Sequence, residues 1–433
     1  MFGLHRSIGN EHSTPLLTIF MAACVCMATP SMFADTEKVL ASFSGQDGAN
    51  PQAGVIFDAS GNLYGTTNAG GDLSCKAIAG CGTIFRMSPG ANGTWTKTTL
   101  HHFNSIDGAN PFGALVFDSA EKNLYGTTGW GGSSSCVQGA FKGCGTVFQL
   151  SHGTNGAWTL KTIHRFSFSG PDGSNPASTL VFDSAGNLYG TTTGGGPNNA
   201  GSVFELSPTL NGTWGVKTLH IFTGANGDGA SPSGPLVFDA TGNLFGTTIR
   251  GGTHNVGTVF ELSPATGGNW TATTLYSFSN SGGNAPDAGV IFDSIGNLYG
   301  TASSDGDICG CKFGTVFELV AGAGGTWTEK TLHTFTTDGS GPGGVIFDSA
   351  GNLYGVTFVG ASSGDGTVFE LSPGSGGTWT ATQLHVFGGT DGAGPVGSLV
   401  FDSSGNLYGA SAYGGSGNNK GTVFEVSPGA SSR

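Results

Sequence analysis

Short apolar runs alternate with polar and Gly-rich segments along the chain, and the runs recur in the same order. One repeat contains an apolar run such as LVFD at 180–183, LYGTT at 188–192, GTVFEL at 257–262 and a longer run such as WTATTLYSF at 270–278. Runs rich in β-branched and aromatic residues between Gly, Pro, Asn and Ser are typical of strands. The pattern therefore predicts four short strands in each repeat and no amphipathic helix.

The repeat can be counted by its NL(Y/F)G core. This core occurs seven times, beginning at Asn62, Asn123, Asn187, Asn243, Asn297, Asn352 and Asn406. Four antiparallel strands make one blade of a propeller, and internal repeats outrank chain length as a guide to domain number. The sequence predicts an all-β fold in which 35–433 forms a single seven-bladed β-propeller of four-stranded antiparallel blades.

The two ends of the chain predict how the ring closes. A Trp that opens the fourth strand follows only six of the seven cores, and the sequence stops after a third strand, GTVFEV at 421–426. The segment TEKVLASF at 36–43 matches the end of a fourth strand. We expect 36–43 to complete the last blade. The alternative is an open β-repeat array, which would leave a free edge at each end.

The recurring stretch FDSAGNLYG at 182–190 predicts a tight hairpin between the first two strands of a blade. Gly186 can take the positive φ that a type I turn with a bulge requires, and Asp183 can accept backbone N–H bonds in the turn. The second copy, SAEKN at 119–123, has an extra residue and no Gly, so a longer loop is expected there.

The first 34 residues resemble a signal peptide. Arg6 lies in a polar start, an apolar segment spans 16–30, and SMFA ends at Ala34, a suitable cleavage point. We expect a secreted or cell-surface bacterial protein. The alternative is a lipoprotein attached through Cys24, although the apolar run continues past that residue.

Composition and charge limit the classes of partner that the protein can bind. The chain has 80 Gly and 30 Phe, only 10% charged residues and a net charge of −13. An acidic surface repels phosphates, so we expect no nucleic acid and no anionic membrane as partner. No apolar run reaches the roughly 18 residues of a spanning helix, so no transmembrane segment is expected in the exported chain. We expect a monomer.

The cysteines indicate an oxidising environment. Cys24 and Cys26 lie in the expected signal, and the other six form three close pairs within single loops: Cys75 with Cys81, Cys136 with Cys144, and Cys309 with Cys311. In an exported protein such pairs predict local disulfides, with Cys309–Cys311 the weakest because its ring is very small. Free or metal-bound thiols are the alternative. A zinc site would need four converging ligands, and the pairs lie in different repeats.

Long motifs connect the repeat with a known family. GNLYGTT, GTVFELSP, the WT…TLH run and the DGA-Pro segment closely resemble the bacterial GloVer (Gloeo/Verruco) tandem repeat, over nearly all of 35–433. FDSAGNLYG is more loosely similar to the hairpin of NHL-like β-propellers. The resemblance implies a choice of C-terminal anchors and brings no catalytic residue. Since the sequence ends in SPGASSR without an apolar segment, we expect simple secretion.

The ionisable residues of the repeat do not predict a catalytic centre. Five histidines share one position in the fourth strand, namely His101, His164, His220, His333 and His385. Five glutamates share one position in the third strand, namely Glu205, Glu261, Glu318, Glu370 and Glu425. Equivalent positions on a ring are spread around it and cannot meet at one metal or form one acid–base pair. No catalytic residue and no metal site are assigned.

One set of acids is left as a candidate. A DGANP-like segment precedes the first strand of six repeats, with its acid at Asp47, Asp107, Asp172, Asp228, Asp338 and Asp391, whereas the fifth repeat has SGGNAP at 281–286. We expect these acids to lie on one face near the mouth of the channel and to cap turns. The alternative is a rim that binds a cation such as Ca²⁺ or a polar ligand.

These observations favour an exported, non-catalytic binding or scaffold protein without a cofactor, whose extracellular ligand is a glycan or a protein. Residues repeated in every blade build a shape rather than a unique site. The alternative is an extracellular propeller enzyme, a lyase or glycan-acting hydrolase, with its site in irregular loops. A deep axial pocket with two or more non-repeated ionisable residues would favour the enzyme.

Overall fold

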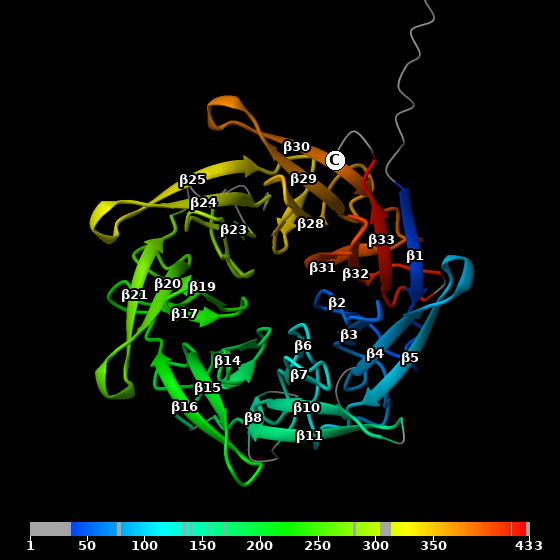
Figure 1. Cartoon of the computed structure of the whole chain (residues 1–433), viewed down its shortest axis with the longest axis horizontal. Helices are drawn as coiled ribbons and strands as arrows, with labels where there is room; N and C mark the ends of the chain where they lie inside the picture. Colours follow the sequence, from blue (N-terminus) through cyan, green and yellow to red (C-terminus); the bar gives the residue numbers. More distant parts are fainter. Residues whose placement is uncertain are drawn as a thin grey trace, which may run out of the picture.

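Seven antiparallel sheets stand around a central axis in the computed structural model (Figure 1). The structure describes residues 36–429, apart from 76–78, 133–135, 139–140, 155, 169, 280–282, 304–312 and 417. The strands of each sheet follow one another from the axis of the ring to its periphery. The predicted all-β seven-bladed propeller is therefore confirmed.

The first four blades have their strands in the following order from the axis outwards. Blade 1 contains β2 (Ile56–Phe57), β3 (Leu63–Thr67), β4 (Thr83–Pro89) and β5 (Trp95–His102). Blade 2 contains β6 (Val116–Phe117), β7 (Asn123–Thr128), β10 (Thr146–His152) and β11 (Trp158–Arg165). Blade 3 contains β12 (Ser174–Pro176), β13 (Val181–Phe182), β14 (Leu188–Gly194), β15 (Ser202–Pro208) and β16 (Trp214–Ile221). Blade 4 contains β17 (Gly229–Pro232), β18 (Val237–Phe238), β19 (Leu244–Gly251), β20 (Thr258–Pro264) and β21 (Trp270–Ser277).

The other three blades follow the same order. Blade 5 contains β22 (Ile291–Phe292), β23 (Leu298–Ala302), β24 (Thr315–Ala321) and β25 (Trp327–Thr334). Blade 6 contains β26 (Ser340–Pro342), β27 (Ile346–Phe347), β28 (Leu353–Val359), β29 (Thr367–Pro373) and β30 (Trp379–Val386). Blade 7 contains β31 (Ala393–Phe401), β32 (Leu407–Tyr413), β33 (Thr422–Ser427) and β1 (Thr36–Ser42).

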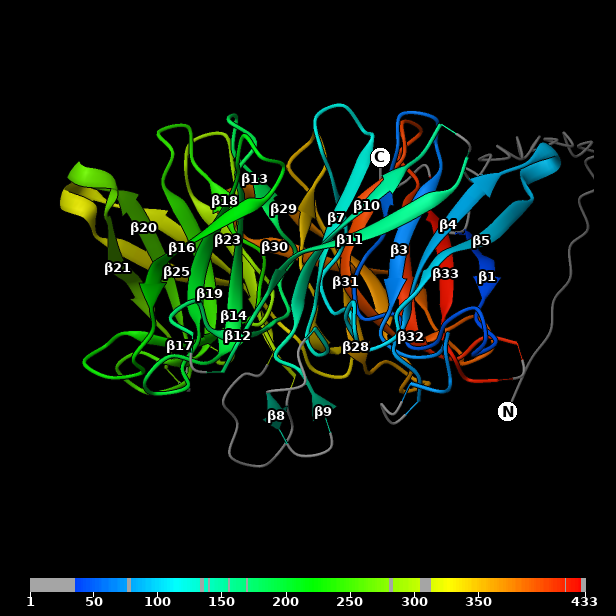
Figure 2. The same cartoon turned by 90° about the horizontal axis from the view of Figure 1, so that it is seen from below.

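The elements outside the blades are small. The hairpin of β8 (Val137–Gln138) and β9 (Phe141–Lys142) projects from one face of the ring (Figure 2). Four 3-10 turns join third to fourth strands, namely η1 (Ala91–Gly93), η2 (Thr266–Gly268), η3 (Ala323–Gly325) and η4 (Ser375–Gly377). None of the helices in the described part of the chain has the length and apolar character to cross a membrane.

The first strand of the described chain closes the ring. β1 pairs antiparallel with β33, from Thr36 opposite Ser427 to Ser42 opposite Thr422 (Figure 1). It thereby supplies the outer strand of blade 7, as the sequence predicts, and the alternative of an open array is wrong. The expected signal peptide at 1–34 lies outside the described residues, and so does the expected domain start at residue 35.

The repeated hairpin follows its predicted chemistry. Asp183 Oδ1 accepts the N–H of Ala185 at 2.9 Å and of Asn187 at 2.8 Å. Its Oδ2 accepts the Asn187 side-chain amide at 2.8 Å and the Tyr189 hydroxyl at 3.1 Å. Gly186 has a φ of +86°, as the turn requires. Each copy of FDSAGNLYG is therefore a turn held by its own aspartate.

The second blade forms the equivalent turn in a different way. Its loop is one residue longer, since the Asp118 N–H donates to the carbonyl of Asn123 instead of to a residue four positions away. Glu121 takes the left-handed conformation with a φ of +51°, where other copies have Gly. This confirms the expected longer loop.

The hydrophobic core lies between the blades, not within them. At each of the seven interfaces the Phe that ends a fourth strand meets the Phe of the next blade's third strand, with ring centroids 4.9–5.3 Å apart and edge-on. Phe103 of blade 1 and Phe148 of blade 2 are one such pair, and both are fully buried. The interfaces therefore depend on one repeated aromatic contact.

A second aromatic contact lies closer to the axis. The ring of Tyr64 on β3 is 5.2 Å from Phe117 and 6.1 Å from Trp158, both in the next blade. The equivalent Tyr or Phe of each blade meets a Phe of the next inner strand in the same way. Aromatic pairs of this geometry add to the free energy gained by burial.

Glu37 on β1 lies at the closing seam. It faces blade 6, where a ligand atom of Glu37, of His385 and of Asp391 all lie within 4.8 Å of one another. Its Oε1 is buried and has no hydrogen-bond partner among the residues that the structure describes. Burial, together with the negative charge of Asp391, raises the pKa of Glu37 from 4.5 to about 7. The closing strand is therefore held best when Glu37 carries a proton.

We expect Phe103→Ala to lower the free energy of unfolding by about 3–5 kcal/mol, because it removes a buried ring from a blade interface. Chemical denaturation monitored by tryptophan fluorescence measures the loss. Phe168→Ala is the matched control, since Phe168 is 52% exposed and its loss should change stability by less than about 0.5 kcal/mol. Equal effects of the two substitutions would contradict the role given to the interface.

We expect Glu37→Gln to remove part of a pH dependence. A carboxyl whose pKa is raised on folding binds more protons in the folded than in the unfolded state, so stability falls as pH rises from about 4.5 to 7. Because Glu37 is half-exposed, we expect the variant to gain only on the order of 1 kcal/mol at pH 8. Thermal unfolding of both proteins from pH 5 to 8 tests this, and parallel curves would refute it.

Candidate functional site

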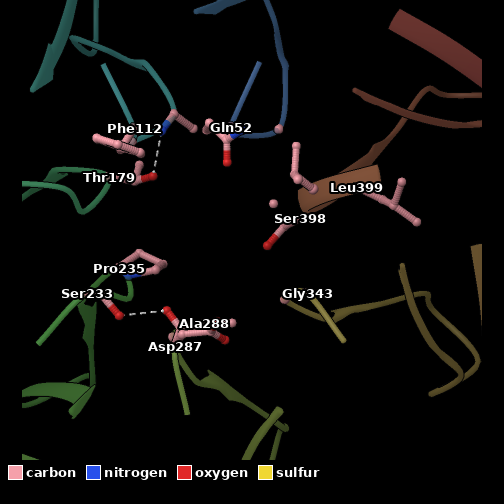
Figure 3. A pocket seen from close by; sticks show the side chains of 18 of the residues that line it. Gln52, Phe112, Thr179, Ser233, Pro235, Asp287, Ala288, Gly343, Ser398 and Leu399 are labelled. Carbon is pink, nitrogen blue, oxygen red and sulfur yellow. Dashed lines mark hydrogen bonds between the residues drawn. The ribbon is translucent and has the colours of Figure 1, made fainter. Parts of the chain in front are cut away.

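The centre of the ring contains a cavity of about 720 Å³. Its wall comes from all seven blades, from the segments that lead into the inner strands and from those strands themselves (Figure 3). Most of the lining is apolar or Gly, with Phe112, Pro235, Val396 and Leu399 among the larger side chains. A cavity of this volume is in the range that holds a small organic molecule.

Backbones of neighbouring blades approach closely around this cavity. A Cβ atom at Gly54 of blade 1 would lie 2.2 Å from the carbonyl oxygen of Ser398 in blade 7. A Cβ at Gly113 of blade 2 would lie 2.5 Å from the carbonyl oxygen of Ser178 in blade 3. Side chains are excluded at these positions, so the cavity wall is built partly of backbone.

One position of the repeat supplies the most variable part of the wall. It is the residue directly after the proline of the segment that leads into each blade, and every copy lines the cavity. The seven residues are Gln52, Phe112, Ala177, Ser233, Asp287, Gly343 and Val396. The residues that follow vary mostly among small types, whereas this position carries a different residue in every blade, from Gly to Phe and Asp.

Asp287 is the one ionisable residue among the described residues that line the cavity. It belongs to the irregular fifth repeat, directly after the SGGNAP segment. Ser233 of the neighbouring blade donates its hydroxyl to the Asp287 main-chain carbonyl at 3.1 Å, which fixes the segment (Figure 3). The Asp287 carboxylate takes part in none of the ion pairs found in the described part of the chain.

The surroundings of Asp287 shift its titration. The walls of the ring enclose the carboxyl on most sides and raise its pKa from 3.8 to about 6, while the N–H groups of Asp287 and Ala288 partly oppose the rise. The side chain is nevertheless exposed to the cavity, so water in the cavity reaches it. Asp287 is therefore ionised at neutral pH and accessible to a ligand.

The six DGANP-like acids lie elsewhere. None of Asp47, Asp107, Asp172, Asp228, Asp338 and Asp391 is among the described residues that line the cavity. They contact the outer strands of the blades. The reason is that the segment after the fourth strand folds back on that strand before it turns toward the axis.

Most of these acids cap their own loops, as expected. Five of the six accept a backbone N–H from two to five residues upstream, for example Asp338 from Thr336 at 2.7 Å and Asp391 from Gly388 at 2.8 Å. Burial disfavours the charge of Asp338, but the bonds from Thr336 and His333 outweigh it and lower its pKa. The capping function accounts for the repetition of these residues.

The fourth-strand histidines pair with the same acids, which the sequence analysis did not predict. The Nε2 to carboxylate distances are 3.0 Å for His101–Asp107, 2.6 Å for His164–Asp172, 3.2 Å for His220–Asp228, 2.7 Å for His333–Asp338 and 2.9 Å for His385–Asp391. The recurrence of a His five to eight residues before each of these acids was the available signal. These pairs are local to one blade and do not converge.

The first acid has a different partner for a clear reason. The strand that precedes Asp47 is β1, which carries Ala41 where five of the other fourth strands carry His. Lys97 of blade 1 reaches across instead, with its Nζ 2.7 Å from Asp47 Oδ2. Although burial opposes it, this bond and that from Ser44 lower the pKa of Asp47.

The other candidate residues fall into two groups. Glu37, His385 and Asp391 are the one group of three metal-ligating side chains that comes together among the described residues, and it contains only one of the six acids. The third-strand glutamates lie in the sheets, opposite the Tyr or Phe of the second strand, as in the pair Glu205 and Tyr189. Neither group touches the cavity.

The structure joins Cys75 with Cys81 and Cys136 with Cys144, the two pairs predicted from the sequence. Both disulfides lie in loops between second and third strands. Cys309 and Cys311 lie outside the described residues, so that pairing stays a prediction.

We expect millimolar Ca²⁺ to leave the melting temperature unchanged, because each acid is already paired with a His or Lys and five of the six also cap their own loop. Asp338→Asn should cost about 1 kcal/mol, since Asn keeps the cap and loses the charge opposite His333. Differential scanning fluorimetry with Ca²⁺ or chelator measures both. A Ca²⁺-dependent rise of several degrees that Asp338→Asn and Asp391→Asn abolish would establish the cation rim instead.

Comparison with solved structures returns propellers at low sequence identity. Similar chains include a gluconolactonase from Xanthomonas campestris (11% identity, 91% of this chain and 90% of that chain, TM-score 0.42). A second is a putative glucose dehydrogenase from Thermus thermophilus (13% identity, 91% of this chain and 100% of that chain, TM-score 0.42). A third is a luciferin-regenerating enzyme (13% identity, 91% of this chain and 95% of that chain, TM-score 0.41). These scores carry no argument about activity.

No curated protein matches the sequence significantly. The family models give a different result. The model described as the Gloeobacter/Verrucomicrobia repeat matches residues 28–136, 135–336 and 271–433, which together span all seven blades. The chain belongs to the Gloeobacter/Verrucomicrobia repeat family.

Proposed function

We propose that the chain is a non-catalytic binding protein that takes a small organic ligand in its axial cavity. The cavity has the volume of a small-molecule site and a largely apolar wall. A glycan or protein ligand at the outer loops is the less favoured version of the same binding function, because those loops repeat the same capping residues in each blade.

The variation after the repeat proline is the observation that carries this proposal. Where seven copies of one motif serve only the shape, the same residue suffices in all of them. At this position each copy differs, and Gln, Phe, Ala, Ser, Asp, Gly and Val all face one cavity. A set of unlike side chains gives the cavity an asymmetric surface, and such a surface can distinguish one orientation of a ligand from another.

The same lining supports binding over catalysis. General acid–base chemistry commonly uses two ionisable groups with different pKa values. The described lining offers Asp287, and the second group that would favour a lyase or glycan-acting hydrolase is not among these residues.

We also propose that the protein is exported. The apolar segment at 16–30, followed by a cleavage-type stretch that ends at Ala34, supports this, and so do the two loop disulfides.

Filling the cavity tests the proposed site. Ala177→Phe introduces the side chain that Phe112 already places at the equivalent position, so the fold should accept it while the cavity loses volume. We expect ligands found by a thermal-shift screen of metabolites and glycans to bind the variant at least about tenfold more weakly, a loss of roughly 1.4 kcal/mol.

Leu210→Phe is the matched control, because Leu210 is fully exposed in a loop and does not line the cavity. It should bind as the unaltered protein does. If Ala177→Phe binds every ligand of the screen with unchanged affinity, the ligand site is not in the cavity and the proposal fails.

A further inference from the structure

We propose that the ligand of the cavity is a small organic cation, an ammonium group on an apolar body, and that Asp287 is its counter-ion. This inference rests on the proposed function and specifies the chemical class that the site would take. It follows from the charges and the surfaces that the described lining offers.

The first step is the missing partner of Asp287. Its carboxylate projects toward the cavity, and no Lys, Arg or His is among the described residues that line it. Other acids of this protein are neutralised nearby, as Asp47 is by Lys97 and Asp172 by His164. A carboxylate in a partly enclosed cavity whose described lining offers no counter-charge attracts a cation.

The second step is the sign and position of the charge in the cavity. Asp287 gives the cavity one negative charge on one side of the ring (Figure 3). Low-dielectric walls focus this field, and the net charge of −13 adds a repulsion for anions. A single carboxylate is too few protein ligands for Ca²⁺, which takes six to eight oxygen ligands. A monovalent organic cation fits this balance.

The third step is the rest of the wall. Phe112, Val396, Pro235 and Ala288 present apolar surface, and Phe112 is 38% exposed. A ligand body of aromatic or aliphatic carbon would bury this surface, which an inorganic cation cannot do. The amide of Gln52 and the hydroxyl of Ser398 add hydrogen-bonding groups to the wall for polar substituents.

Asp287 also gives the site a pH dependence. It is the one titratable group in the described lining, and its pKa of about 6 means that its charge is lost as pH falls below that value. Affinity for a cation should therefore decline between pH 7 and 5. Affinity for a neutral ligand of the same shape should stay constant.

Matched probes test the inference directly. Isothermal titration calorimetry at pH 7.5 compares 2-phenylethylammonium, 2-phenylethanol and phenylacetate, which share an aromatic body and differ in charge. We expect the ammonium to bind at least about tenfold more tightly than the alcohol, and phenylacetate most weakly. Asp287→Asn should bring the ratio of ammonium to alcohol affinity near one. Asp107→Asn removes the same charge outside the cavity and should leave the ratio unchanged.

The outcomes separate this inference from the proposed function. If ammonium and alcohol bind equally and Ala177→Phe weakens both, the cavity is a ligand site and the inference of a cation is overturned. A ratio that Asp107→Asn lowers as much as Asp287→Asn does overturns it too, since the effect is then one of net charge. If neither probe binds, the cation inference fails, and the screen with Ala177→Phe still decides the proposed function.

Discussion

The edge-on contact between phenylalanines of adjacent blades is the interaction on which the ring depends. Each blade is a thin sheet with little interior of its own, so its apolar side chains are buried only against the next blade. Phe103 and Phe148 are fully buried because two sheets meet there. The contact recurs at seven interfaces with nearly constant geometry, which sets the same angle between successive sheets and brings the seventh beside the first. A single poorly packed interface would strain the other six.

The constant angle between sheets explains why some positions of the cavity wall accept only Gly while others accept different side chains. Near the axis the sheets converge until backbones touch, so Gly54 and Gly113 have no room for a side chain. One or two residues away, the side chain after the proline lines the cavity, and its type differs from blade to blade. Gln52, Phe112 and Asp287 occupy this same position in three blades of one ring. A repeat fold thus keeps its shape through recurring residues, while the short segment that leads into each inner strand can vary and change the chemistry of the cavity.

The sequence predicts the fold well because its signals are local and repeated. Asp183 and Gly186 specify one hairpin, and the same Asp and Gly recur in five further copies. The remaining copy has Glu121 in place of Gly, and its extra residue predicted a longer loop. The candidate site was predicted less well. Asp107 and His101 were recognised separately, because pairing depends on a loop that folds back onto its strand. Asp287 has no motif of its own, and only the meeting of seven blades shows that it faces a cavity.

The pairing of β1 with β33 has a consequence for how the molecule is made. β1 leaves the ribosome before any blade is complete, and its partner is synthesised almost 400 residues later, since Thr36 pairs with Ser427. Until then the growing protein is an arc with an unpaired strand at one end and an exposed blade surface at the other. Joining the two ends costs the loop entropy of nearly the whole chain, and this cost is lowest once the intervening blades have stacked and hold the ends together. We therefore expect the ring to close last, although the strand that closes it, β1, is synthesised first.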